Sequence, residues 1–199
     1  PMIISTTPEA SEHQIRKSYP SYFAVIAAIT GMNAAVGPYT WYFDPPNSAP
    51  TSPATAPPTM PIAGGSPDAI ASLLSDYFTE MVDIIFAHGG TLDKFIGDAI
   101  MALWGAPIPH EDDPDRAMQA AITMQRAIAV LNAKWEEEGR PGISVGIGIT
   151  YGESFAGNIG SHRRLEYTVI GDVVNVASRL CSAAAPGEIL VTDAFYRQL

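Results

Sequence analysis

The sequence predicts an α+β domain, specifically a ferredoxin-like βαββαβ sandwich with further strands and helices after it. Three observations predict this class. Two long segments carry apolar residues at helical spacing, and each is introduced by a capping residue and a proline. Shorter runs rich in apolar and β-branched residues lie around them, which is typical of strands. One such region turns at a Gly-Asp pair, as a β-hairpin does.

The first three elements follow from local signals. Tyr22–Thr30 is an apolar stretch consistent with a buried strand. The first helix is expected to begin with Ser66 as N-cap and Pro67 at the first helical position, and to stop at Gly89-Gly90. Thr91–Trp104 contains two short apolar-alternating runs and is predicted to be a β-hairpin.

The second half of the sequence contains start and stop signals of the same kind. Asp113 is predicted to cap a helix that runs to Glu138. Ile143–Thr150 and Ser154–Ile159 are predicted as two separate strands. The remaining expected elements are a strand at Tyr167–Ile170, a helix at Val173–Ala184, a strand at Glu188–Val191 and a helix at Asp193–Leu199.

The domain organisation is predicted from shifts in composition. Residues 1–21 are polar and irregular, which indicates a linker, and residues 22–199 are expected to form one domain. Within it, residues 37–67 hold most of the prolines. Such a segment buries too little apolar surface to offset its ordering entropy, so we expect a long, mobile insertion.

Charge and cysteine content exclude some classes of function. The net charge is −10 with only 11 Lys and Arg, which argues against a nucleic-acid surface. Cys181 is the only cysteine, so no intrachain disulfide forms and a reducing, cytoplasmic setting is expected. The apolar run Tyr22–Ile29 is too short to span a membrane, which predicts no membrane contact by this stretch. Because the chain opens on Pro1, we expect a longer parent protein, which can itself be membrane-anchored.

The first candidate constellation is the hairpin around Lys94 and Asp98. Strand alternation places Lys94 and Phe95 on opposite faces, and Asp98 follows Gly97 at a tight turn, where a carboxylate is exposed and can meet a divalent cation. The structural alternative is that Gly-Asp is ordinary turn chemistry and that the lysine is simply solvated.

The second constellation is Asn175 with Arg179. Four residues apart on a helix, the two share a face. An amide and a guanidinium there can hold a ribose and a developing phosphate charge, because the arginine fork matches phosphate oxygens. The structural alternative is that Asn175 fills a polar gap and Arg179 makes a surface ion pair.

Together the segments resemble a known family. Lys94–Gly105 reads KFIGDAIMALWG, Ala156–Ser161 reads AGNIGS, and Glu166–Arg179 contains the run IGDVVNVASR. From about Ser66 to Leu199 the chain is similar to the catalytic domains of class III adenylyl and guanylyl cyclases. The resemblance implies their α+β sandwich fold.

The resemblance also implies roles for single residues. Asp98 matches the second of two metal-binding aspartates of the family. Lys94 and Thr168 match the pair that contacts the purine base. Asn175 matches the asparagine that orients the ribose, and Arg179 the arginine that stabilises the transition state. Since the last two face the metal site of the other subunit, the resemblance implies a homodimer with shared active sites.

The implied reaction is the conversion of ATP to 3′,5′-cyclic AMP and pyrophosphate. Two Mg²⁺ or Mn²⁺ ions per site are expected, clamping the attacking and leaving oxygens. Lys94 with Thr168 is the combination of the ATP enzymes, whereas the guanylyl cyclases carry Glu at the lysine position, so guanylyl cyclase activity is the less favoured alternative.

The sequence departs from the family pattern in its first part. Ala28 stands where the first metal-binding aspartate belongs, and a methyl group cannot coordinate a metal. The proline-rich insertion follows directly, and a family lysine that helps to hold the triphosphate would lie beyond Leu199, so a C-terminally truncated domain is expected. The alternative function is therefore a degenerate cyclase domain that serves as a dimerisation or nucleotide-binding module.

Overall fold

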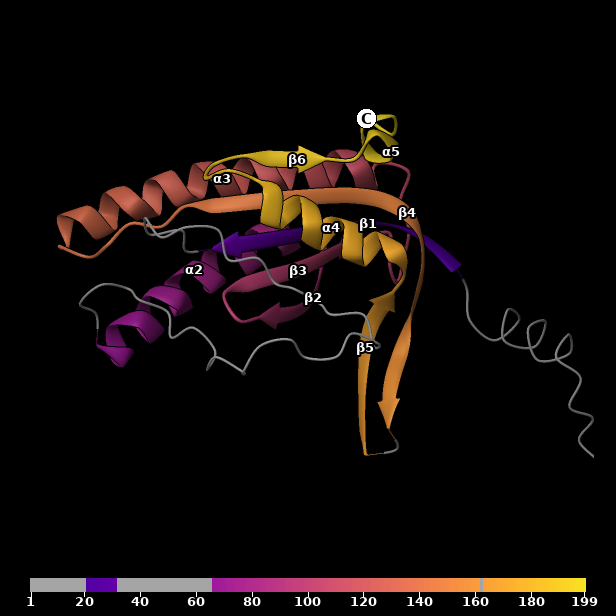
Figure 1. The fold of residues 1–199 in the computed structure, drawn as a ribbon, viewed down its shortest axis with the longest axis horizontal. Coiled ribbons are helices and arrows are strands. Elements are labelled where there is room, and N and C mark those ends of the chain that lie inside the picture. Colours follow the sequence, from indigo (N-terminus) through magenta and orange to yellow (C-terminus); the bar gives the residue numbers. More distant parts are fainter. Residues whose placement is uncertain (1–20, 32–65, 162) are drawn as a thin grey trace, which may run out of the picture.

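A computed structural model describes residues 21–31, 66–161 and 163–199 (Figure 1). The strands are β1 (Ser21–Gly31), β2 (Thr91–Ile96), β3 (Ala99–Trp104), β4 (Val145–Ser161), β5 (Arg164–Ile170) and β6 (Ile189–Val191). The helices are α2 (Pro67–Ala87), α3 (Asp113–Glu137), α4 (Asp172–Ala183) and α5 (Asp193–Tyr196). The predicted linker at 1–21 and insertion at 37–67 lie outside the described residues, except where β1 and α2 begin.

The strands form one six-stranded sheet in the order β2-β3-β1-β4-β5, with β6 paired to β4. β1 lies in the middle and is antiparallel to both β3 and β4. β2 forms a hairpin with β3 and lies at the edge of the sheet, and the order of elements gives the βαββαβ connection predicted from the sequence. The expected ferredoxin-like α+β fold is thus confirmed.

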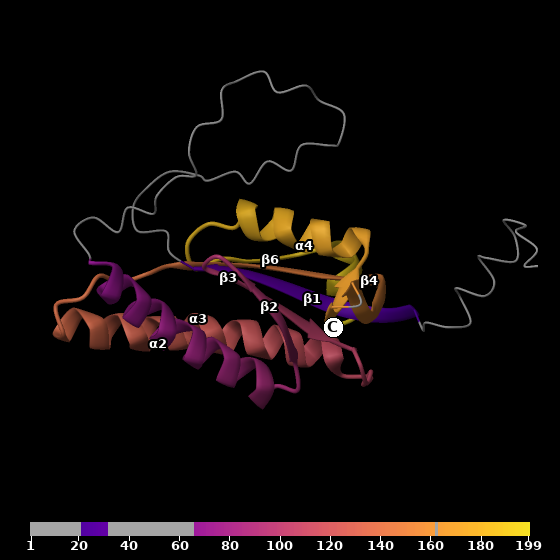
Figure 2. The same ribbon diagram turned by 90° about the horizontal axis from the view of Figure 1, so that it is seen from below.

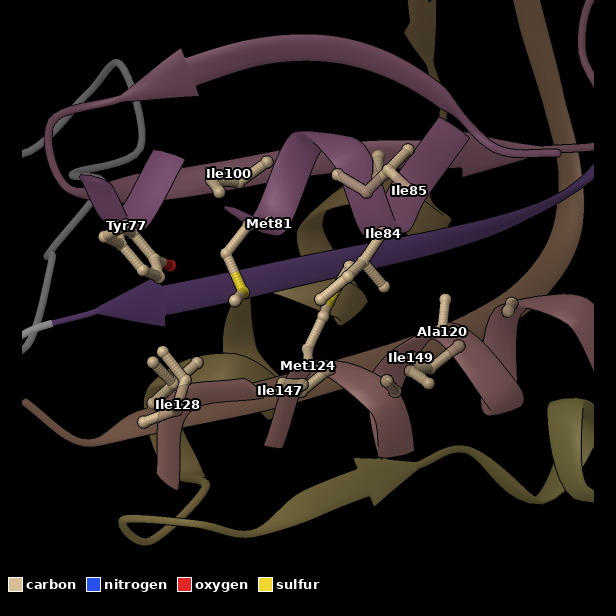
Figure 3. Packing of buried hydrophobic residues seen from close by; sticks show 14 of the residues in the cluster. Tyr77, Met81, Ile84, Ile85, Ile100, Ala120, Met124, Ile128, Ile147 and Ile149 are labelled. Atoms are coloured by element: carbon tan, nitrogen blue, oxygen red, sulfur yellow. The ribbon is translucent and has the colours of Figure 1, made fainter. Parts of the chain in front are cut away.

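The helices α2 and α3 cover one face of the sheet (Figure 2). As predicted, α2 begins at Pro67 and its cap Ser66 accepts a hydrogen bond from Ala69 N at 3.3 Å. Its apolar stripe meets that of α3 and the sheet in a continuous core (Figure 3). The labelled core residues are Tyr77, Met81, Ile84, Ile85, Ile100, Ala120, Met124, Ile128, Ile147 and Ile149. Burying an aliphatic side chain of this size contributes about 1.5–3 kcal/mol.

The helix α4 lies on the opposite face of the sheet (Figure 2). There Met101 and Leu103 of β3 pack with Ala177 of α4, whereas Ile100 and Ala102, which alternate with them, belong to the core under α2 and α3. Because β3 is covered on both faces, its run of apolar residues is almost continuous.

The two strands predicted at Ile143–Thr150 and Ser154–Ile159 are one continuous strand, β4. The glycine between them is not a turn signal. A Cβ at Gly152 would lie 2.5 Å from Val173 Cγ1, and one at Gly148 would lie 2.4 Å from the backbone N of Cys181. Both glycines therefore allow α4 to approach the sheet closely, and the strand runs on unbroken.

The start of α3 differs from the prediction by one residue. Asp112, not Asp113, occupies the N-cap position, and it makes no side-chain capping bond. Asp113 is instead buried and accepts a hydrogen bond from the backbone N–H of His110 at 2.6 Å. The carboxylate of Asp113 thus binds the backbone of the turn before the helix. An aspartate in this role occurs at a similar place in the sequence to one that caps a helix.

No helix in the described ranges is both long and apolar enough to cross a bilayer. The location of the protein in the cytoplasm remains a prediction.

Candidate active site

The strand β2 contains a bulge at the first candidate constellation. Leu92 pairs with Ala102 and Lys94 pairs with Met101, so Asp93 is an extra residue without a partner of its own on β3. A bulge shifts the alternation of side chains by one. Leu92 accordingly packs under α2 and α3, whereas Lys94 pairs with a residue of the α4 face.

The bulge brings two charged groups together. Lys94 Nζ lies 3.7 Å from Asp93 Oδ2, and the Asp93 side chain is 0% exposed while that of Lys94 is 37% exposed. The lysine is therefore anchored at a buried carboxylate and still reaches solvent, where its remaining N–H groups can meet a ligand.

Thr168 of β5 completes this cluster. Its Oγ1 donates a hydrogen bond of 3.1 Å to Asp93 Oδ2, and the residue is only 9% exposed. Lys94 and Thr168, the two residues matched to the base-contacting pair, are thus brought to one carboxylate from distant parts of the chain.

Asp93 is the member of this cluster that the sequence analysis missed. Its Oδ1 is buried and has no hydrogen-bond partner among the described residues. Burial raises the pKa of this carboxyl group, while the Thr168 hydrogen bond and the Lys94 charge act to lower it. The sequence does contain a signal for Asp93. Leu92 and Lys94 are two residues apart and would lie on the same face of a regular strand, yet one is apolar and the other is charged. This mismatch indicates an irregularity of the strand between them.

Asp98 lies at the turn between β2 and β3, directly after Gly97, whose φ of 65° suits a tight turn. The carboxyl group is half-buried, and burial raises its pKa. Its neighbour Ala99 pairs with Thr30 of β1, while Ala28 pairs with Met101 further along. Position 28 therefore lies in the sheet close to the turn that carries Asp98.

The described residues include no group of three or more His, Cys, Asp or Glu side chains arranged to hold a metal ion. Asp98 supplies one hard oxygen donor, as Mg²⁺ or Mn²⁺ requires. The donor set of the described residues therefore fits a contact to a divalent cation through Asp98, and among these residues no second carboxylate completes the pair of the family.

Asn175 and Arg179 lie on α4 and are exposed. The helix packs on the sheet through Ala177 and Cys181, so residues two positions away from these lie on its outer face. Within the described part of the chain, Arg179 has no carboxylate within ion-pair distance, so the surface ion pair considered as an alternative is not formed there. Neither residue is hydrogen-bonded to Lys94 or Thr168.

The family of the chain follows from its sequence. A sequence model of the adenylate and guanylate cyclase catalytic domain matches residues 59–199. The chain therefore belongs to the family of class III cyclase catalytic domains.

Curated relatives include a named cyclase. The chain is 35% identical over 117 residues to adenylate cyclase 1 of Rhizobium meliloti, covering 59% of this chain and 18% of that protein. It is 41% identical over 128 residues to an uncharacterized protein of Mycobacterium tuberculosis, covering 62% of this chain and 21% of the relative. The chain thus spans about a fifth of the length of these relatives.

Solved structures of both cyclase types share the fold. The guanylyl cyclase Cya2 superposes with a TM-score of 0.74 at 29% identity, over 90% of this chain and 79% of that one. The adenylyl cyclase CyaB from P. aeruginosa superposes with a TM-score of 0.74 at 27% identity, over 90% and 81%. Because enzymes named for either nucleotide match equally well, the fold does not determine which base is bound.

Proposed function

We propose that this domain is an adenylyl cyclase, which converts ATP to 3′,5′-cyclic AMP and pyrophosphate at a homodimer interface. The observation that carries the proposal is the convergence of Lys94 and Thr168 on Asp93, within a fold that belongs to the cyclase family. The name of the Rhizobium meliloti relative supports the same activity.

The base is proposed to be read by Lys94 and Thr168. The lysine has only donors, and position 1 of adenine is an acceptor, whereas guanine carries an N–H there. The partial exposure of Lys94 leaves its ammonium accessible to a ligand. A mismatch at this position leaves a buried polar group unpaired, which discriminates strongly between substrates.

The reacting groups are proposed to be held by α4. Asn175 orients the ribose, and the guanidinium of Arg179 contacts the phosphates, for which its planar fork is suited. The ribose 3′-oxygen attacks the α-phosphorus in line, the bond from phosphorus to the bridging oxygen of the leaving pyrophosphate breaks, and the proton of the 3′-hydroxyl passes to solvent. Arg179 stabilises the charge that develops on the phosphate oxygens.

Asp98 would hold the divalent metal, Mg²⁺ or Mn²⁺, of which two ions per site are expected. When bound, these ions supply positive charge that acidifies the attacking hydroxyl and neutralises the leaving group. The half-buried position of Asp98 at a turn allows such a contact.

A homodimer is supported by apolar side chains left on the surface. Phe95 and Ile96 at the end of β2 are 45% and 53% exposed, and Leu165 and Ile170 of β5 are 62% and 56% exposed. β5 and the end of β4 form a hairpin that extends from the body of the domain (Figure 1). Large apolar side chains left exposed on a surface can mark an interaction site, here proposed for a second copy of the chain.

The proposal is tested by incubating the purified protein with ATP and Mn²⁺ and measuring cyclic AMP. GTP is assayed in parallel, and the Arg179→Ala variant provides a matched inactive control. Cyclic AMP made by the wild type and not by the variant is expected. Cyclic GMP as the main product would contradict the choice of base.

The second candidate is a degenerate cyclase domain that binds nucleotide or dimerises without turnover. It is favoured by Ala28, which stands at the position of a family metal ligand and lies in the sheet beside the Asp98 turn. Nucleotide binding without cyclic product, in a protein that sediments as a dimer, would select this function.

A further inference from the structure

We propose that Asp93 is a positioning residue that fixes the hydroxyl hydrogen of Thr168 and thereby makes the base site select a purine with an amino group at position 6. The inference rests on the proposed function, because it takes this cluster to be the site of a purine nucleotide.

The argument begins with the hydroxyl of Thr168. A threonine hydroxyl can donate or accept a hydrogen bond, so by itself it fits both an amino group and a carbonyl oxygen. An ionised carboxylate only accepts. Thr168 Oγ1 therefore donates its hydrogen to Asp93 Oδ2, at 3.1 Å, and its lone pairs alone remain for a ligand.

The consequence is a preference at position 6 of the purine. The amino group of adenine donates to the lone pairs of Thr168, whereas the O6 of guanine or hypoxanthine presents a second acceptor. Without Asp93 the hydroxyl would rotate to serve either base. The carboxylate thus turns an ambivalent hydroxyl into a selective acceptor.

The placement of Asp93 supports this role. The residue is the extra one of a β-bulge, and its side chain is 0% exposed. Burying a carboxylate is costly unless it is paired, and Lys94 Nζ at 3.7 Å and the Thr168 hydroxyl are its partners among the described residues. Both partners are the residues matched to the base-contacting pair, so the buried charge serves this cluster.

The test isolates the contact at position 6. Purine riboside triphosphate keeps the acceptor at position 1 and lacks the 6-amino group. We would measure dissociation constants for the 3′-deoxy forms of ATP and of purine riboside triphosphate by calorimetry with Mn²⁺. Because the 3′-deoxy forms lack the attacking hydroxyl, the measurement does not depend on turnover.

The wild type is expected to bind the adenine nucleotide about tenfold more tightly, the effect of one well-placed hydrogen bond. Thr168→Val removes the acceptor and is expected to bring this ratio close to one, whereas Thr168→Ser should retain it. Asp93→Asn and Asp93→Ala are expected to lower the ratio a few-fold, because the hydroxyl is then no longer held with its lone pairs towards the base. Asp83→Asn, the same change at an exposed position of α2, should leave it unaltered. In the Thr168→Val background, Asp93→Asn should have no further effect.

An unchanged ratio in a folded Asp93 variant, or additive effects of Asp93→Asn and Thr168→Val, would overturn the inference. If the Asp93 variants fail to fold, an unchanged ratio in Thr168→Val overturns it by itself. A chain with the expected ratios that makes no cyclic AMP would retain this inference and lose the proposed function. A chain that binds neither nucleotide would lose both.

Discussion

The two halves of the candidate site are built differently. The proposed base side is assembled within one chain, where Lys94 and Thr168 meet at the buried Asp93. The proposed catalytic side is dispersed, because Asp98 lies at a turn and Arg179 on an exposed helix face, with no ion pair or hydrogen bond between them. Burial and direct bonding fix the first arrangement before any ligand binds, whereas the second requires something further to bring its residues together.

This difference indicates which functions one chain performs alone. A base site held by its own hydrogen bonds is preorganised for binding. A dispersed catalytic side is consistent with the proposed dimer, in which each chain completes the centre of its partner. Binding selectivity and turnover should therefore respond to different substitutions.

The largest expected effect is on turnover. Arg179→Ala removes a positioned charge that stabilises the transition state, so cyclic AMP formation should fall by about 10² to 10³. The dissociation constant of 3′-deoxy-ATP should change far less. Mixing Arg179→Ala with Asp98→Ala chains should restore part of the activity, since one hybrid site of each heterodimer is intact. No recovery in a verified heterodimer would show that the centre is not shared.

A gain in turnover of comparable size is expected from restoring an aspartate at position 28. Ala28→Asp should raise the rate of cyclisation by about 10² or more, because a second carboxylate can then compensate the metal charge. The matched control is Ala27→Asp, since strand alternation puts position 27 on the other face of β1. A wild type that is already fully active, with no gain in the variant, would show that another group replaces the aspartate.

Base choice should respond to the lysine independently of the catalytic side. Lys94→Glu replaces donors by acceptors, which suits the N–H at position 1 of guanine, so the ratio of kcat/KM for ATP over GTP should fall about a hundredfold. Lys134→Glu, the same charge change at an exposed position of α3, serves as control. An unchanged ratio would remove Lys94 from the base site.

A smaller effect on turnover is expected from a substitution that displaces α4 from the sheet. A Cβ at Gly148 would lie 2.4 Å from Cys181 N and 2.6 Å from Ala177 O, both of them backbone atoms of α4. Gly148→Ala should therefore displace the helix, lower the free energy of unfolding by about 1–3 kcal/mol and reduce turnover. The base ratio should persist, because the Asp93 cluster lies on β2 and β5. Gly146→Ala, with its nearest contact at 3.1 Å, is the milder control, compared by denaturant unfolding.

The fold was largely predictable from local signals. The Ser66 cap, the Gly-Asp turn and the helical stripes gave correct elements because each depends on neighbouring residues alone. The division of β4 into two strands was wrong because the role of Gly152 depends on Val173, a distant residue of α4. A single sequence does not distinguish a glycine that allows a helix to pack closely on the strand from a glycine that makes a turn.

The site was less predictable from physical reasoning. Lys94 and Thr168 were paired through the family resemblance, since their separation in the chain carries no signal of contact. Asp93 was missed because a bulge changes which way a side chain points without changing composition. The roles of Asp98 and Arg179 remain predictions, because the proposed centre depends on a second chain.

The smallest expected effect is a pH dependence of base selectivity. Burial raises the pKa of Asp93, so its carboxylate takes up a proton at a higher pH than a free aspartate does. Lys94 on β2 opposes this protonation and Glu166 on β5 favours it. Once protonated, the carboxyl group can donate to Thr168, and the hydroxyl is released to serve either base. The affinity ratio of 3′-deoxy-ATP over its purine riboside analogue should therefore be constant at alkaline pH and fall a few-fold, by about one hydrogen bond at most, as the solution is made acidic. Both ligands carry the same triphosphate, so its titration cancels in the ratio. Asp93→Ala should give a ratio that is low and independent of pH, and a wild-type slope that persists in this variant would assign the titration to another group.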